Sequence, residues 1–308
     1  MSQVELALFL ESAVRLGIPL ALAAMGETIT ERSGVINIGI EGSIIAGALG
    51  GSLGAIAFGG AGLGIAFGAL TGLLVALVFA VFAIGLGADQ IITGTAVTIG
   101  GLGMTGALYQ VVFGVNGMEL SVPMLAPAAI PWLSDIPVIG SAFFAQAPTA
   151  YFAYVMAPLA WYVLFKTAWG LELRATGESP VAAEAAGVRV RAVRFSATLF
   201  GGAMAGIAGA HLALAHAGAF AENMSAGKGF IAIAVVALGR WNPIIVLFAA
   251  LFFGGASALQ FLLQALGFDL AYQIFLAFPY ILTLAALAGW VGKSRAPAAL
   301  ALPWEPNR

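Results

Sequence analysis

The sequence predicts an all-α membrane protein: a polytopic bundle of about nine transmembrane helices, within a range of about eight to ten. Of its 308 residues 61% are hydrophobic and only 8% are charged, whereas a soluble domain carries about 25% charged residues. Long stretches contain no Asp, Glu, Lys or Arg, namely 42–88, 90–118, 195–221, 241–268 and 270–292. A soluble enzyme, a nucleic-acid-binding protein and a disordered protein are therefore excluded.

The expected membrane segments are read from apolar runs of roughly 20 residues. They lie near 5–25, 35–58, 62–86, 90–113, 148–168, 195–216, 228–240, 243–264 and 271–291. The run 35–58 is interrupted by Asn37 and Glu41, and the run 228–240 is short. We expect both to be broken or re-entrant helices.

Orientation follows from the distribution of Lys and Arg, which favour cytoplasmic loops. The loop 166–194 carries Lys166, Arg174, Arg189, Arg191 and Arg194, whereas 114–147 carries no basic residue and four prolines. The first loop is therefore predicted to be cytoplasmic and the second external. Counting spans places the C-terminus inside and the N-terminus outside, although one extra re-entrant segment would reverse the N-terminus.

Glycines recur at the spacing that lets membrane helices approach closely. Gly60, Gly64, Gly68 and Gly72 follow one another every four residues, and the stretch 201–209 has a similar pattern of small residues. We expect these faces to pack tightly against other helices.

No catalytic or metal-binding residue is predicted, and the chain is not expected to be an enzyme. The chain has no cysteine, so disulfides and thiolate sites are excluded. The strings 101–106 and 50–54 match nucleotide-binding and hydrolase motifs but lie in apolar helices with no strand beside them. His211 and His216 are about 140° apart around a helix and cannot share a metal. A Walker sequence is absent, so any ATP must bind to another chain.

The basic loop contains a short helix with clear ends. Ser179 is a good N-cap, Pro180 suits the first helical position, and Gly187 can adopt the left-handed conformation that ends a helix. So short a helix is not stable alone. We interpret it as a docking helix for another protein; a capped loop helix without a partner is the alternative.

The stretch 26–42 holds polar residues at membrane depth. Asn37 and Glu41 are four residues apart, so they would share one helical face, and glycines weaken the helix around them. Discontinuous helices at substrate sites have this pattern. Two interpretations remain open: Glu41 lines a passage, or it pairs with Arg32 or with backbone amides and fixes the fold.

These stretches make the chain resemble the permease subunits of bacterial ABC importers of the branched-chain amino acid, ribose and nucleoside type. The resemblance is closest to the nucleoside and simple-sugar branch and to the shorter permease of a pair. It extends from about residue 16 to the tail and is carried by 26–42, 134–140, 167–187, 227–234, 239–243, 278–280 and 296–300. Thr98 departs from it, because relatives commonly have Asn there.

The resemblance implies a single transmembrane permease domain, 1–308, of a type II-like importer in the lipid bilayer of the bacterial cytoplasmic membrane. Its implied partners are a second, paralogous permease, an ABC ATPase with possible fusion of its two domains, and an extracytoplasmic substrate-binding lipoprotein. ATP and Mg would bind only to the ATPase, and this chain would hold no cofactor. The helix at 179–187 would be the coupling helix; the implied coupling residues are Arg174, Gly177, Glu178, Ser179, Pro180, Ala183, Glu184, Ala186 and Gly187.

The predicted function is therefore the translocation of a nucleoside or similar small solute. Candidate polar groups along the path are Asn37, Glu41, Gln90, Thr93 and Asn223. Simple sugars and branched-chain amino acids are alternative substrates. A stand-alone secondary transporter, with Glu41 and the two histidines carrying protons, is the competing class; it has no need of a cytoplasmic docking helix.

Overall fold

The computed structural model describes residues 3–113, 122–265, 277, 281, 285 and 296–304. Over this part the chain is almost entirely helical, and its one strand pair is β1 (Ala128–Ala129) with β2 (Ala145–Gln146), antiparallel. The helices are α1 Gln3–Arg32, α2 Ile40–Phe58, α3 Ala61–Ala80, α4 Gln90–Phe113, α5 Ile139–Phe144, α6 Pro148–Lys166, α7 Ala168–Glu178, α8 Pro180–Ala185, α9 Val190–His211, α10 Lys228–Leu238 and α11 Pro243–Ala265. Two π-helical turns, η1 (Val81–Gly85) and η2 (Leu212–Ala217), extend α3 and α9.

Seven helices in the described residues are long and apolar enough to cross a membrane: α1, α2, α3 with η1, α4, α6, α9 with η2, and α11. The chain is thus a multi-pass helical membrane protein. The prediction of about nine spans is not confirmed. The expected segment 228–240 is α10, which has only 11 residues, and a full span needs roughly 20. The expected segment 271–291 lies outside the described residues, apart from three single positions.

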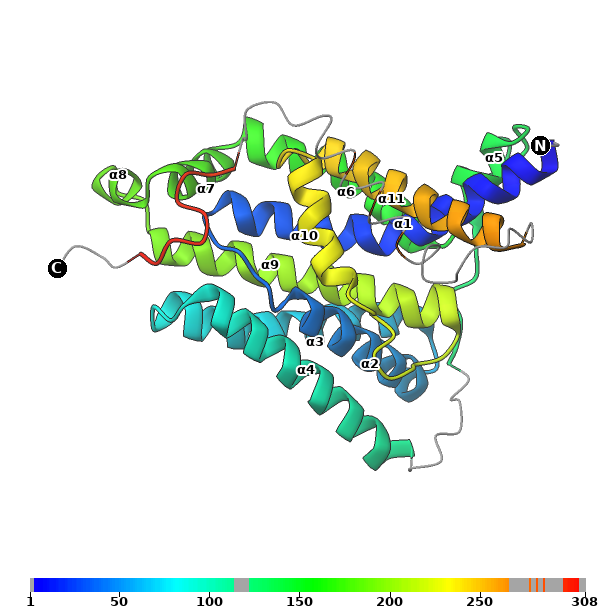
Figure 1. Cartoon of the computed structure of the whole chain (residues 1–308), viewed down its shortest axis with the longest axis horizontal. Helices are drawn as coiled ribbons and strands as arrows, with labels where there is room; N and C mark the ends of the chain where they lie inside the picture. Colours follow the sequence, from blue (N-terminus) through cyan, green and yellow to red (C-terminus); the bar gives the residue numbers. More distant parts are fainter. Residues whose placement is uncertain are drawn as a thin grey trace.

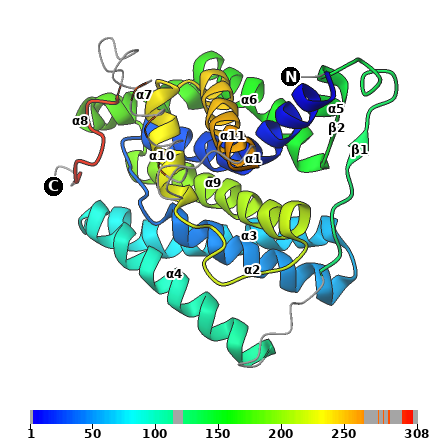
Figure 2. The same ribbon diagram turned by 45° about the vertical axis from the view of Figure 1, so that its right-hand side comes forward.

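The long helices are arranged in two layers on either side of α9. Figures 1 and 2 show α1, α6 and α11 on one side of α9 and α2 and α3 on the other. Two helices depart from this arrangement. The short α10 crosses the direction of α1 and α9, and α4 diverges from the bundle along its length (Figure 1). The fold therefore has a compact centre and one outlying helix.

Glycines line the contact between α3 and α9, as their spacing predicts. A Cβ atom added to Gly72 would lie 2.6 Å from Gly206 Cα, and one added to Gly68 would lie 3.1 Å from the Gly206 carbonyl oxygen. Gly209 faces α2 in the same way, 2.8 Å from the carbonyl carbon of Ile44. Gly60 differs, because it has open space around it. The backbones of α2, α3 and α9 thus touch directly, which only small residues allow.

We expect Gly206→Val to lower the thermal stability of the detergent-solubilised protein. The first added atom would lie 3.0 Å from Gly72 Cα, so α3 and α9 must separate, at a cost of about 1–3 kcal/mol or more. Gly62→Ala is the matched control, because nothing lies within 4 Å of the new methyl group and alanine favours a helix. Equal melting temperatures for the two variants would contradict this packing.

Candidate functional site

The connection between α1 and α2 is an irregular segment inside the protein. Residues 33–39 have no α-helical turn, although most of them are buried. Gly34 has a positive φ of 89°, which ends α1 at little steric cost. Because α2 begins only at Ile40, Asn37 lies outside it, and the expectation that Asn37 shares a helical face with Glu41 is wrong.

Three side chains, one on α1 and two on α4, form hydrogen bonds with this irregular backbone. Glu27 Oε1 accepts from the Asn37 amide at 2.8 Å, and Gln90 Oε1 accepts from the Ile36 amide at 2.9 Å. The Thr98 hydroxyl donates to the Ile38 carbonyl at 3.0 Å. Non-helical backbone at membrane depth is tolerated only against protein or water. These bonds therefore let the chain break between α1 and α2.

Glu41 joins the first turn of α2 to the beginning of α10. Its Oε1 accepts from the Gly227 amide at 2.8 Å and its Oε2 from the Gly229 amide at 2.5 Å. Glu41 is only 2% exposed, and a carboxylate is favourable at a helix N-terminus. The sequence leaves open whether Glu41 lines a passage or pairs with Arg32 or with backbone amides, and the structure shows pairing with backbone amides. The Arg32 guanidinium donates from Nε to the Trp241 carbonyl at 3.1 Å.

The five path candidates lie at different places in the described structure. Asn37, Glu41 and Gln90 are buried around the start of α2. The side chains of Glu41 and Gln90 accept hydrogen bonds from backbone amides, whereas Asn37 donates its own backbone amide to Glu27. Thr93 lies one turn beyond Gln90 on α4 and is half-buried, whereas Asn223 is exposed in the loop before α10. A role of these residues in the path stays a prediction.

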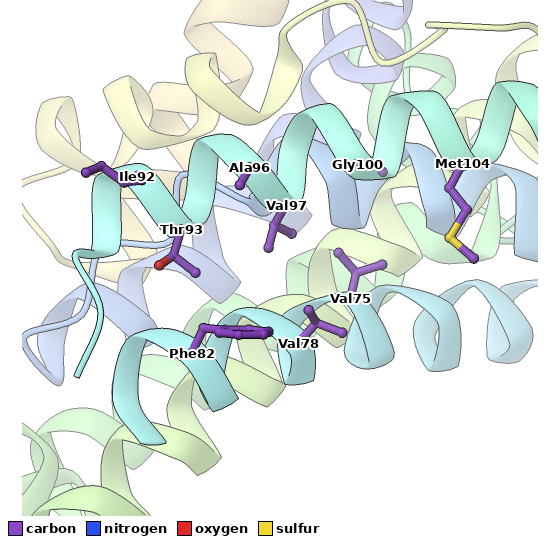
Figure 3. A pocket seen from close by; sticks show the side chains of 10 residues that line it. Val75, Val78, Phe82, Ile92, Thr93, Ala96, Val97, Gly100 and Met104 are labelled. Carbon is purple, nitrogen blue, oxygen red and sulfur yellow. The ribbon is translucent and has the colours of Figure 1, made fainter. Parts of the chain in front are cut away.

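Thr93 borders a groove between α3 with η1 and α4. Figure 3 shows side chains from both helices facing one another across this groove, whose volume is about 510 Å³. Thr93 is the single polar residue among its described lining; the others are Val75, Val78, Phe82, Ile92, Ala96, Val97, Gly100, Gly101 and Met104. The groove thus offers apolar contact and almost no hydrogen bonding.

Two buried carboxylates on α1 were missed by the sequence reasoning. Glu27 and Glu31 are 0% and 2% exposed, and Glu31 Oε2 accepts a hydrogen bond of 2.5 Å from the Trp241 indole. Their spacing of four residues, directly after the apolar stretch 16–25, was the available signal, because intramembrane carboxylates need partners. Together they attach the end of α1 to the irregular segment and to the residues after α10.

The short helix α8 has the predicted caps and lies at one end of the bundle. Ser179 Oγ accepts from the Ala182 amide at 3.4 Å, Pro180 is the first helical residue, and Gly187 has φ of 88°. Ala183 is 4% exposed and faces inward, whereas Val181 is 55% exposed. Figure 1 shows α8 projecting beyond the long helices. Nothing in the described chain covers its outer side, where Ala186 and Gly187 are also exposed and Glu184 is half-buried.

The helix before it, α7, is fastened to the bundle. Arg174 Nε donates to the Leu164 carbonyl at 3.0 Å, and its guanidinium lies over the Phe165 ring at 5.2 Å. Gly177 lies so close to α1 that an added Cβ would be 3.2 Å from the Gly34 amide. The tail adds two bonds: the Ala299 amide donates to the Gly177 carbonyl at 2.9 Å and the Ala298 amide to Glu178 Oε2 at 3.3 Å. The end of α7, directly before α8, therefore abuts the irregular segment after α1.

One third of the chain is similar to a guanosine ABC transporter permease protein of Bacillus subtilis, NupP, at 36% identity over 107 residues. A different guanosine permease protein of the same organism, NupQ, matches far more of the chain, with 37% identity over 295 residues, 93% of this chain and 92% of NupQ. The chain thus resembles two permease proteins that carry the same guanosine description.

Two further relatives also match along most of their length. The nucleoside ABC transporter permease protein NupC of Lactococcus lactis is 36% identical over 290 residues, 91% of each chain. The putative glucose ABC transporter permease protein TsgC13 of Haloferax volcanii is 35% identical over 301 residues, 91% of this chain and 90% of TsgC13. No solved structure matches the chain. Residues 9–287 match the family described as branched-chain amino acid transport system / permease component, and the chain therefore belongs to this family of ABC transporter permeases, as a membrane subunit that is not itself the ATPase.

Proposed function

We propose that this chain forms part of the translocation path of an ATP-driven importer for a nucleoside or similar small solute. The observation that carries the proposal is its 37% and 36% identity, over more than nine-tenths of the chain, to permeases named for guanosine and nucleosides. The broken connection between α1 and α2 supports it, because irregular backbone among membrane helices is typical of transport proteins.

The remaining subunits of this importer follow from the same proposal. A second, paralogous permease pairs with this chain, which the similarity to both NupQ and NupP supports. An ABC ATPase binds ATP and Mg and docks on α8, whose exposed Val181 and capped ends suit it for that contact. A substrate-binding lipoprotein delivers the solute from outside, and contacts the loop 114–147. The complex lies in the bacterial cytoplasmic membrane, with the C-terminus of this chain on the cytoplasmic side.

The movement of α8 reaches the path through α7. ATP binding can drive transport only by favouring one arrangement of the permeases over another. A displacement of α8 would be transmitted at Gly177, which abuts the segment after α1. That segment is hydrogen-bonded to Glu27 on α1 and Gln90 on α4. Motion of the docking helix therefore changes the positions of α1, α2 and α4 relative to one another.

A simple sugar is the second candidate substrate, because TsgC13, described as a putative glucose permease, is 35% identical over most of both chains. Branched-chain amino acids have the support of the family description alone. Nucleosides and glucose both contain a sugar ring with adjacent hydroxyl groups, which branched-chain amino acids lack.

Co-purification followed by uptake tests the proposal. We expect the tagged chain, extracted in mild detergent, to retain a second permease, an ATPase and a lipoprotein, identified by mass spectrometry. Reconstituted in liposomes with ATP, this complex should take up radiolabelled guanosine, and a non-hydrolysable ATP analogue should abolish uptake. Uptake of glucose instead of guanosine would favour the second candidate. A chain that purifies alone and transports without ATP would contradict the proposal.

A further inference from the structure

The loop 218–227, between η2 and α10, has no regular helix yet is firmly held. The Val122 amide donates to the Gly218 carbonyl at 3.1 Å, and Glu41 accepts from the amide at the other end, Gly227. In between, the Phe220 ring lies 5.3 Å from the ring of Tyr109 on α4. The loop passes over α2 in both views (Figures 1 and 2). Its conformation is therefore fixed by α2, α4 and the segment that begins at Val122.

This loop brings a carboxylate alongside the membrane-spanning part of α4. Gln110 Nε2 donates to Glu222 Oε1 at 3.3 Å, and a Cβ added to Gly106 would lie 3.9 Å from the same oxygen. Both α4 residues belong to the apolar span that ends at Val112. Glu222 thus lies beside the last two turns of a membrane helix.

The polar groups at this place are exposed rather than buried. Gln110, Glu222 and Asn223 are all exposed. Apolar side chains on α4 are exposed beside them: Met104 is 67% exposed and Val111 82%. An ionisable group facing hydrocarbon costs several kcal/mol, so such groups face water or protein. Gln110 lies two residues before the end of the span, so this surface of α4 and the loop faces water at the membrane boundary, a hydrated passage or another subunit, and not lipid alone.

The chemistry of the three side chains suits a neutral solute with adjacent hydroxyl groups. A carboxylate has two oxygens that accept hydrogen bonds, so it can receive both hydroxyls of a vicinal diol. The amides of Gln110 and Asn223 add donors and acceptors for the ring and its remaining substituents. Asn223 is held in a left-handed conformation with φ of 58°, which asparagine tolerates better than most residues.

We propose that Glu222, with Gln110 and Asn223, forms a binding site for the vicinal hydroxyls of the solute along the passage. The site rests on the proposed function, since it assumes a nucleoside or sugar substrate. It adds that the permease itself, and not only the binding protein, recognises the hydroxyl groups of the solute. A contact with the second permease is the competing use of the same exposed groups.

The test compares guanosine with 2′-deoxyguanosine in the reconstituted complex, each at a concentration that saturates the binding protein. The wild-type complex is expected to take up guanosine faster. Glu222→Gln replaces a charged acceptor by a neutral amide, so guanosine uptake should fall about 10- to 100-fold and the preference for guanosine should largely disappear. ATP hydrolysis stimulated by the binding protein should remain. Glu172→Gln, which removes an exposed carboxylate on α7, is the control and should behave as wild type.

The possible outcomes separate the hypotheses. Unchanged uptake and preference in Glu222→Gln would overturn the hydroxyl site while leaving the importer intact. Loss of the second permease on purification, together with loss of stimulated ATP hydrolysis, would assign Glu222 to subunit contact and also overturn the site. Absence of nucleoside uptake by the wild-type complex would instead overturn the proposed substrate.

Discussion

Replacing residues 179–187 by a Gly/Ser linker of equal length is expected to abolish ATP-dependent uptake while leaving the chain inserted in the membrane. The replacement removes α8 (Pro180–Ala185) and its cap at Ser179, but none of the seven long apolar helices. A six-residue helix is not stable by itself, and in the proposed importer the ATPase covers its exposed side. Uptake in proteoliposomes and retention of the ATPase on purification are the two measurements.

A point variant tests the same surface without deleting it. Val181→Glu places a charge on the outer side of α8, where the valine is 55% exposed, and should release the ATPase and reduce uptake by at least about tenfold. Leu302→Glu is the matched control, because Leu302 is also 55% exposed at the same end of the bundle. Full uptake in Val181→Glu, or in the linker variant, would refute the assignment of α8 as the docking helix.

The sequence predicts features that depend on neighbouring residues. The caps of α8 are visible in Ser179, Pro180 and Gly187 because helix ends are encoded within a few positions. Glycines spaced four apart define one helix face, so the sequence predicts that 60–72 and 201–209 pack tightly, although not that they pack against each other. Apolar length likewise places seven of the nine expected segments, in the described part, within helices long enough to cross the membrane.

Local sequence patterns could not predict which distant residues contact one another. The bond between Glu41 and Gly227 joins residues 186 positions apart, and that between Glu31 and Trp241 joins residues 210 apart. Hydropathy showed that a carboxylate at Glu41 needs a partner, but not which partner. The same limit explains Asn37: a period of 3.6 residues assumes a continuous helix over 37–41, but α2 begins only at Ile40.

Removing the carboxylate of Glu41 is expected to cause the largest loss of stability of any single polar substitution considered. Glu41→Ala leaves the amides of Gly227 and Gly229 without the oxygens that now lie 2.8 and 2.5 Å away. Each buried donor left without a partner costs about 1–3 kcal/mol, so the total is about 2–6 kcal/mol. The melting temperature of the solubilised protein measures this loss, and uptake should fall with it because α10 loses its attachment to α2.

Two further variants separate the contact from the charge. Glu41→Gln keeps one acceptor oxygen and should be intermediate in stability, whereas Gly229→Ala should resemble Glu41→Ala because its methyl group would lie 2.6 Å from the Glu41 amide nitrogen. Glu172→Ala is the control, since that carboxylate is exposed on α7 and exposed charges contribute little to stability. An unchanged melting temperature in Glu41→Ala would contradict the anchoring of α10. Lost uptake in a fully stable Glu41→Gln would instead favour a direct role of Glu41 in the path, because stability and transport would then have separate causes.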